Sequence, residues 1–296
     1  HQLFDNILIQ NLSNSQDTQL LQAALQSDSD IIDIHHAGTA MRFLTSYYAI
    51  QEGKTVVLTG SERMKQRPIK FLVDALRDLG AEISYLENEG FPPLKISGKK
   101  ILKSTVRIPA NISSQFITSL MLIGAKLENG LQIKLEGTVT SKPYLEMTLK
   151  ILRTVGINNH WVGNVIKIQP NIHTEKHSQS IPFVVESDWS SASYYYSLAA
   201  ISRKTINLKW FKPFSLQGDS RIKEIYWKFF GVNTISEGAE SRISLLPEHY
   251  FQFPEKIVLN MNDCPDIAQT LCVTATSLKI PFEITGLETL KIKETD

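Results

Sequence analysis

The stretch His36-Ala37-Gly38-Thr39-Ala40-Met41-Arg42 lies between an apolar run typical of a strand, residues 31–34, and a run typical of a helix, residues 43–50. Gly38 has no side chain, so a ligand can come close to the backbone at this corner. Thr39 is a residue type that caps helices, and the N–H groups at a helix N-terminus can bind anions. A single corner of this kind is more often a tight turn than a binding site.

The corner recurs along the chain. Gly38, Ser114, Ser190 and Asp266 each stand at a predicted strand-to-helix corner, and successive corners are 76 residues apart (114−38, 190−114 and 266−190). A second set of markers keeps nearly the same spacing: Arg67-Pro68, Lys142-Pro143, Gln217-Gly218 and Lys293-Glu294. This period is longer than that of common solenoid repeats, so each copy is predicted to be an α/β unit with two helices.

Composition limits the class of protein. The 296 residues suggest about two domains, and the content of 42% hydrophobic and 21% charged residues is typical of a globular protein. A net charge of +1 does not indicate a surface for nucleic acid or membrane. The two cysteines, Cys264 and Cys272, match no zinc-site spacing and are interpreted as free thiols in a reducing cytoplasm. No metal site is predicted.

Repeated strand–helix–strand units predict an α/β fold with parallel or mixed sheets. Residues 121–125 and 197–201 are apolar almost throughout, so these helices are predicted to face inward between sheets. We predict two domains, 1–185 and 186–296, with a hinge near Glu186. The chain begins at His1 and ends at Asp296 in mid-repeat, so we expect the first domain to lack part of its N-terminal unit and the second to be incomplete.

The corners suggest anion binding. Helix N-termini favour nearby negative charge, and Arg63, Lys65 and Arg67 add full positive charges close to the first corner. Simpler interpretations remain open here. The Arg63–Arg67 loop can be a solvated charge run, and Ser113-Ser114, Ser190-Ser191 and Asp266 can be helix caps. Asp266 is a carboxylate where the other copies have Gly or Ser, which suggests a base set in a phosphate site.

Seven motifs in order resemble one family, the 5-enolpyruvylshikimate-3-phosphate synthases, also called 3-phosphoshikimate 1-carboxyvinyltransferases. They are Ala37-Gly38-Thr39-Ala40-Met41-Arg42, Arg63-Met64-Lys65-Gln66-Arg67-Pro68, Ser113-Ser114-Gln115-Phe116, Ser141-Lys142-Pro143-Tyr144, Ser190-Ser191-Ala192-Ser193-Tyr194, Pro265-Asp266 and Lys293-Glu294-Thr295-Asp296.

The resemblance implies the two-domain enolpyruvyl transferase architecture, with three repeated α/β units in each domain. It implies transfer of the enolpyruvyl group of phosphoenolpyruvate to the 5-hydroxyl of shikimate 3-phosphate, with release of phosphate, in the shikimate pathway of aromatic amino-acid and chorismate biosynthesis. It implies no metal and no organic cofactor, small-molecule substrates as the only partners, a cytoplasmic location, and a monomer at full length.

The resemblance also assigns roles by motif. Gly38 and Arg67 would hold phosphoenolpyruvate, and Gln115 would touch both substrates. Asp266 would be the base on the 5-hydroxyl, and Glu294 would take part in proton transfer at the methylene carbon. Shikimate 3-phosphate would be held by Ser113, Ser114, Gln115, Ser141, Asp266 and Lys293.

The sequence departs from the family pattern at three positions. His36 and Thr289 stand where the family often has Asn, and Phe43 stands where many members have Pro. Charged ligands of both substrates would precede His1 or follow Asp296. The two anionic substrates must lie side by side, and two like charges ~4 Å apart repel by about 4 kcal/mol at an effective dielectric near 20. Without those charged ligands to neutralise the substrates, we expect the 296 residues alone to be inactive.

Two alternatives stand beside this interpretation. UDP-N-acetylglucosamine enolpyruvyl transferase shares the fold and the chemistry, but it usually has a Cys in the loop before its Arg-Pro, and residues 61–66 contain none. The other alternative is a folded ligand-binding fragment without catalysis.

Overall fold

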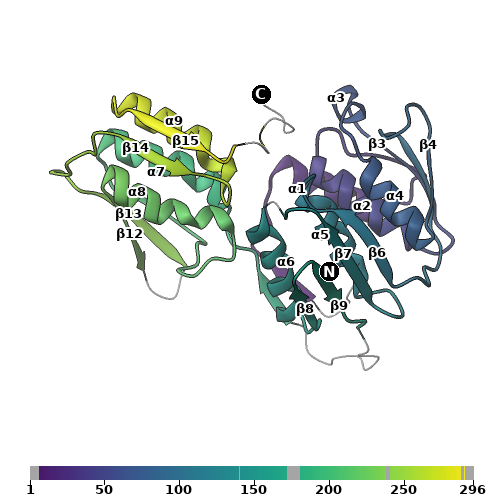
Figure 1. Ribbon diagram of the computed structural model, residues 1–296. Helices are drawn as coiled ribbons and strands as arrows, with labels where there is room; N and C mark the ends of the chain where they lie inside the picture. The colour runs from purple at the N-terminus through teal and green to yellow at the C-terminus, as the bar shows by residue number, and fades with distance from the viewer. Residues whose placement is uncertain (1–6, 140, 172–180, 238–240, 288–289, 291–296) are drawn as a thin grey trace. The chain divides into compact units, whose positions relative to one another are not determined.

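The computed structural model describes residues 7–139, 141–171, 181–237, 241–287 and 290 (Figure 1). Its internal contacts divide the chain into two units. The first unit comprises His1–Thr140 and Thr148–Val184, and the second comprises Ser141–Met147 and Val185–Asp296. The predicted domains, 1–185 and 186–296, made no provision for the short segment Ser141–Met147.

The first copy of the repeat forms a mixed sheet with the order β2-β3-β5-β4. Its elements are β2 (Ile31–Asp33), α2 (Gly38–Ala49), β3 (Thr55–Thr59), α3 (Glu62–Lys65), α4 (Lys70–Leu79), β4 (Glu82–Tyr85) and β5 (Leu94–Ser97). The β2 and β3 strands are parallel, with Ile31 opposite Val57, and the other pairs are antiparallel. Val56 and Leu58 alternate with more exposed residues and point into the core.

The second copy repeats this plan with the sheet order β6-β7-β9-β8. Its elements are β6 (Thr105–Pro109), α5 (Ser114–Gly124), β7 (Leu131–Glu136), α6 (Lys142–Thr154), β8 (Asn159–Val162) and β9 (Val165–Ile168). Again the first pair is parallel and the others are antiparallel. The equal strand order in the two copies confirms the internal repeat that the 76-residue spacing predicted.

The third and fourth copies lie mainly in the second unit. Their elements are β10 (Ile181–Val184), α7 (Trp189–Ser202), β11 (Ile206–Leu208), η1 (Gly218–Arg221), α8 (Ile222–Phe230), β12 (Val232–Glu237), β13 (Arg242–Pro247), β14 (Ile257–Asn260), η3 (Pro265–Ile267), α9 (Ala268–Ser277) and β15 (Phe282–Thr285). The sheet order is β11-β13-β12, and β14 pairs with β15 in parallel. The β10 strand instead pairs in parallel with β1 (Ile7–Gln10), which is followed by α1 (Gln16–Gln26).

Central helices of neighbouring copies pack against each other inside each unit. In the first unit α2 contacts α5, and in the second α7 contacts α9. Small polar side chains about one repeat apart join these helices: Ser119 Oγ donates to the Arg42 carbonyl at 2.8 Å, and Ser193 Oγ donates to Thr270 Oγ1 at 2.9 Å. The helices therefore face inward, as the sequence predicted.

The prediction of buried helices is correct for α5 but only half correct for α7. Residues Phe116–Met121 of α5 are all buried. In α7 one face is buried around Trp189 and Tyr196, whereas Tyr194 and Leu198 are 68% and 54% exposed. An apolar sequence shows that a helix can be buried all round, but the number of neighbours decides whether it is.

One local prediction needs correction. The segment before Pro68 was predicted to be a loop, but it contains the one-turn helix α3, which is capped by Ser61, whose Oγ accepts the Met64 N–H at 3.3 Å. The next helix, α4, begins at Lys70. Within the described residues, no helix has both the length and the apolar composition needed to cross a bilayer.

Candidate functional site: helix corners in two units

The first corner places Gly38 at the N-terminus of α2. Ala37 is the residue before the helix and has no side-chain group that could cap it. The expectation that Thr39 caps this helix is wrong, because Thr39 lies inside the first turn. Its Oγ1 instead accepts a hydrogen bond from Gln115 Nε2 at 3.1 Å. The α2 N-terminus therefore keeps its dipole and N–H groups available to a ligand.

Two guanidinium groups lie against Gly38. A Cβ atom built on Gly38 would collide with Arg67 Nη1, would lie 3.0 Å from Arg67 Cζ and would lie 3.2 Å from Arg42 Nη1. Any larger residue at this position would displace at least one of these side chains. The absence of a side chain at Gly38 is therefore what allows Arg67 to approach the helix N-terminus.

The three cations of the loop have different surroundings. Lys65 pairs with Glu62 at 3.2 Å and with Glu87 at 3.3 Å, and these hydrogen bonds, first to Glu62 and then to Glu87, raise the pKa of Lys65. Arg63 is exposed and donates to Gln66 Oε1 at 3.3 Å. Arg67 is partly buried beside Gly38. Of the three, Arg67 has the position to hold an anion at the corner.

The second corner begins α5. Ser113 occupies the N-cap position, but its side chain makes no capping hydrogen bond among the described residues, so the cap interpretation fails here. Ser114 begins the helix, and Gln115 reaches the first corner through Thr39. The structure thus brings Gly38, Arg67 and Gln115 together, with Ser113 and Ser114 next in the chain.

The third corner is occupied by the protein's own carboxylate. Asp188 caps α7, and its side chain accepts the N–H groups of Ser190 at 3.2 Å and Ser191 at 2.9 Å. Ser190 Oγ donates to Asp219 Oδ2 at 2.5 Å. Ser190 and Ser191 are therefore not the caps that the sequence suggested. They are capped by Asp188.

Asp266 lies at the fourth corner, exposed, in the single turn η3. The cap interpretation of Asp266 is wrong, because Cys264 is the residue before η3 and Ile267 is the residue before α9. Two residues before Asp266 in the chain, burial raises the pKa of the Cys264 thiol to about 11. Neither cysteine forms a disulfide among the described residues, and no group of three or more His, Cys, Asp or Glu side chains there is arranged to hold a metal.

Comparison with known proteins decides the family. The EPSP synthase (3-phosphoshikimate 1-carboxyvinyltransferase) family matches residues 5–296. A relative from Bacteroides fragilis, named 3-phosphoshikimate 1-carboxyvinyltransferase, is 44% identical over 288 residues, which is 97% of this chain and 68% of the relative. The chain belongs to the EPSP synthase family.

Other members of the EPSP synthase family agree. Relatives with the same name from Methanospirillum hungatei and Haemophilus influenzae are 36% and 38% identical; the matches cover 92% and 88% of this chain, but 62% and 59% of those proteins. A solved structure of EPSP synthase from Acinetobacter baumannii has a TM-score of 0.71 at 19% identity, over 100% of this chain and 72% of that one, which shows the same fold.

The remaining site residues expected in an EPSP synthase are only partly placed. Ser141 is described, with a positive φ of 52°, directly before α6. Lys293 and Glu294 lie outside the described residues, as does Thr289.

Arg42, the last residue of the Ala37–Arg42 motif, lies near the first corner, and no role was predicted for it. Arg42 is 5% exposed, and its Nη1 donates to the Gly38 carbonyl at 2.9 Å. The signal was present in the sequence, because residues four apart on a helix are neighbours.

Proposed function

We propose that this chain carries the enolpyruvyl transfer of its family: phosphoenolpyruvate gives its enolpyruvyl group to the 5-hydroxyl of shikimate 3-phosphate, and phosphate is released. The observation that carries the proposal is the first corner. There the uncapped α2 N-terminus, Gly38 without a side chain and the guanidinium group of Arg67 meet. This combination suits a small ligand with a phosphate and a carboxylate.

We assign each residue a substrate according to the helix or loop that carries it. Gly38 and Arg67 hold phosphoenolpyruvate, and Gln115, tied to Thr39 at 3.1 Å, contacts both substrates. Ser113 and Ser114, at the uncapped start of α5, hold shikimate 3-phosphate, as do Ser141, Asp266 and Lys293. The contact between Gln115 and Thr39 supports this division, because it sets α5 beside the phosphoenolpyruvate corner.

Two carboxylates would carry the proton transfers. A proton added to the methylene carbon of phosphoenolpyruvate leaves a cationic centre at C2, which the 5-hydroxyl oxygen attacks. Asp266 accepts the hydroxyl proton, and Glu294 takes part in proton transfer at the methylene carbon. When the methyl group formed from this carbon loses a proton again, the double bond is restored and phosphate leaves from C2. The exposure of Asp266 and its place outside the cap position support a chemical role for it.

We further propose that the two units act as the two domains of a monomer in the cytoplasm, with phosphoenolpyruvate and shikimate 3-phosphate as its partners. The unpaired thiols Cys264 and Cys272 support a reducing compartment. The alternative UDP-N-acetylglucosamine enolpyruvyl transferase is not favoured, since the relatives described above are named for the shikimate reaction.

The test is phosphate release from the two substrates. It is run on a version extended to the length of the Bacteroides relative, so that the result does not depend on where the 296 residues begin and end. Asp266→Asn keeps the size of the side chain and removes the base, so turnover should fall by ~10²–10⁴-fold, the usual contribution of one general acid–base group.

Binding of shikimate 3-phosphate to Asp266→Asn should change much less than turnover. Unchanged turnover would remove Asp266 from the mechanism. No phosphate release by the extended wild type would overturn the proposed function and leave the binding-fragment alternative.

A further inference from the structure

Arg42 contacts all three segments that form the first corner. Its Nη1 donates to the Gly38 carbonyl at 2.9 Å and lies 3.7 Å from Met64 Sδ in α3. Its guanidinium carbon lies 6.0 Å from the centre of the Phe116 ring in α5, next to Gln115. The side chain therefore joins the start of α2, the α3 turn and the start of α5.

The fold itself does not require an arginine at this place. The residues four positions after the corners Gly38, Ser114, Ser190 and Asp266 are Arg42, Thr118, Tyr194 and Thr270. Thr118 and Thr270 are buried like Arg42, at 3% and 8% exposure, and each bonds another hydroxyl. A small hydroxyl residue thus fills the same helix position in two other copies. Burying a guanidinium is costly, so its presence in the first copy needs another reason.

That reason is the position of Arg67. Arg42 contacts the side chain of Met64. The carbonyl oxygen of Met64 accepts the backbone N–H of Arg67 at 3.0 Å. The same Arg42 Nη1 lies 3.2 Å from the Cβ position of Gly38, on which Arg67 also converges. A single guanidinium therefore fixes the distance between the helix N-terminus and the turn that carries Arg67.

We propose that Arg42 is a positioning residue, which holds the α3 turn and Arg67 against the Gly38 corner so that phosphoenolpyruvate meets a preformed site. This inference rests on the proposed function of that corner. It predicts that loss of Arg42 loosens residues 61–67 and weakens phosphoenolpyruvate binding.

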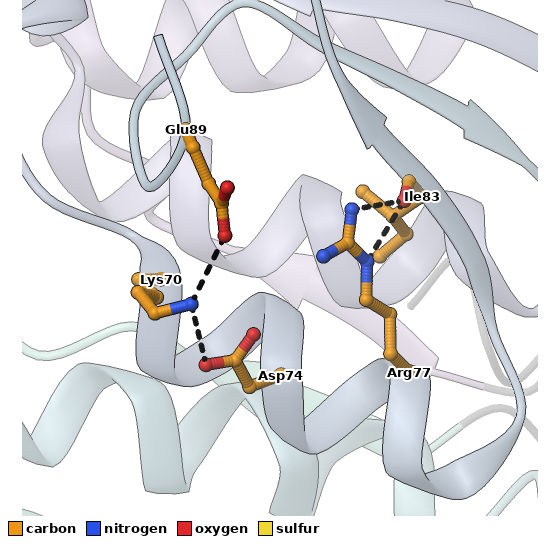
Figure 2. Close-up of polar contacts among 5 residues, drawn as sticks. All are labelled: Lys70, Asp74, Arg77, Ile83 and Glu89. Atoms are coloured by element: carbon orange, nitrogen blue, oxygen red, sulfur yellow. Dashed lines mark hydrogen bonds and ion pairs between the residues drawn. The ribbon is translucent and has the colours of Figure 1, made fainter.

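The chain offers a matched control in the same unit. Figure 2 shows Arg77, whose Nε and Nη2 donate to the Ile83 carbonyl at 2.9 and 2.7 Å. Its guanidinium also lies over a ring, 5.0 Å from the centre of Tyr85. Arg77 thus has the same kinds of contact as Arg42, a backbone carbonyl and an aromatic ring, but it joins α4 to β4 instead of the corner.

The experiment compares Arg42→Met, Arg42→Lys and Arg77→Met with the wild-type 296-residue protein. Amide hydrogen exchange is measured by mass spectrometry, and phosphoenolpyruvate affinity is measured by NMR titration. In Arg42→Met, residues 61–67 should exchange at least about tenfold faster, as expected when a hydrogen bond from a charged group is lost. Phosphoenolpyruvate should bind about tenfold more weakly. Arg42→Lys, which keeps the charge, should recover part of both, and Arg77→Met should change neither.

Unchanged exchange at residues 61–67 in Arg42→Met would overturn the proposal, and so would an equal effect of Arg77→Met. If Arg42→Met does not fold, Arg42→Lys decides, because it must show the same local pattern at smaller amplitude. If the wild-type 296 residues do not bind phosphoenolpyruvate, the titration is repeated on the extended version used for the phosphate-release test. Absence of binding there would contradict the proposed function, and the exchange comparison would still decide whether Arg42 positions the turn.

Discussion

The corners of α2 and α7 are equivalent positions two repeats apart, yet they treat negative charge in opposite ways. At α2 the residue before the helix is Ala37, and Arg42 and Arg67 lie against Gly38. At α7 the side chain of Asp188 already accepts the N–H groups of Ser190 and Ser191. One corner has cations and an uncapped helix end, whereas the other is closed by the chain's own anion.

This difference shows that a repeated corner is a scaffold and that a few side chains decide its use. A helix N-terminus attracts an anion wherever it occurs, so the protein must either cap it or reserve it. Asp188 caps α7, which then contributes to stability. The α2 end stays uncapped, so its stabilisation can come from a ligand.

The largest effect is expected at the uncapped corner. In Gly38→Ala the new methyl group would collide with Arg67 Nη1 and crowd Arg42 Nη1. Phosphoenolpyruvate affinity, measured by calorimetric titration, should fall about tenfold to two hundredfold, the range for one extra carbon in a fitted pocket. The affinity for shikimate 3-phosphate should fall much less. An equal loss for both ligands would mean that Gly38 is needed only for folding.

A smaller effect concerns the buried thiol of Cys264, directly before η3 at the fourth corner. Burial raises the pKa of Cys264 from 9.0 to about 11, so the folded state disfavours the thiolate. The stabilising effect is full below pH 9 and disappears as pH rises through about 11, because the unfolded chain loses its proton first. Relative to Cys264→Ala, the wild type should lose roughly 2 kcal/mol of unfolding free energy over that interval.

The measurement is chemical denaturation of both proteins at several pH values. If the unfolding free energies of wild type and Cys264→Ala change with pH in the same way, the thiol is reached by water in the folded protein and the prediction fails.

The smallest expected effect on stability distinguishes an N-cap residue that makes capping hydrogen bonds, Asp188, from one that makes none, Ser113. Asp188→Ala removes the acceptor of two backbone N–H groups and of the Ser191 hydroxyl at the start of α7, and it should lower the unfolding free energy by about 1 kcal/mol. Ser113→Ala removes a side chain that makes no capping bond at the start of α5, so it should cost less than about 0.5 kcal/mol. Both are measured by urea denaturation without ligand. Equal costs would erase the contrast between the two corners.

The sequence predicted the repeat because the spacing of Gly38, Ser114 and Ser190 is a local, countable pattern. It also predicted a strand before the first corner and a helix after it, which are β2 and α2, but it did not predict the antiparallel strands β4, β5, β8 and β9. The cap of α7 is Asp188, a residue type that favours this position, and Ser190 lies inside the first turn. The contact of the Ser190 hydroxyl with Asp219, 29 residues away, was not predictable because it depends on the fold.

The same limit applies to the loop cations. Arg63, Lys65 and Arg67 look alike in sequence, and only the fold shows that Glu87, 22 residues beyond Lys65, engages that lysine and leaves Arg67 beside Gly38. Arg42 is an intermediate case. Its helical spacing from Gly38 was visible, but its contacts with Met64 and Phe116 required the folded unit.

The central claim is that the α2 corner is reserved for an anion and the α7 corner is not. The most direct test is a phosphoenolpyruvate titration of the ¹⁵N-labelled protein, in which the backbone amide shifts at both corners are followed together. We expect the amides of Gly38, Thr39 and Gln115 to shift, those of Ser190 and Ser191 to stay, and Arg67→Met to reduce the response. Shifts at Ser190 and Ser191 without any at Gly38, or an undiminished response in Arg67→Met, would contradict the account.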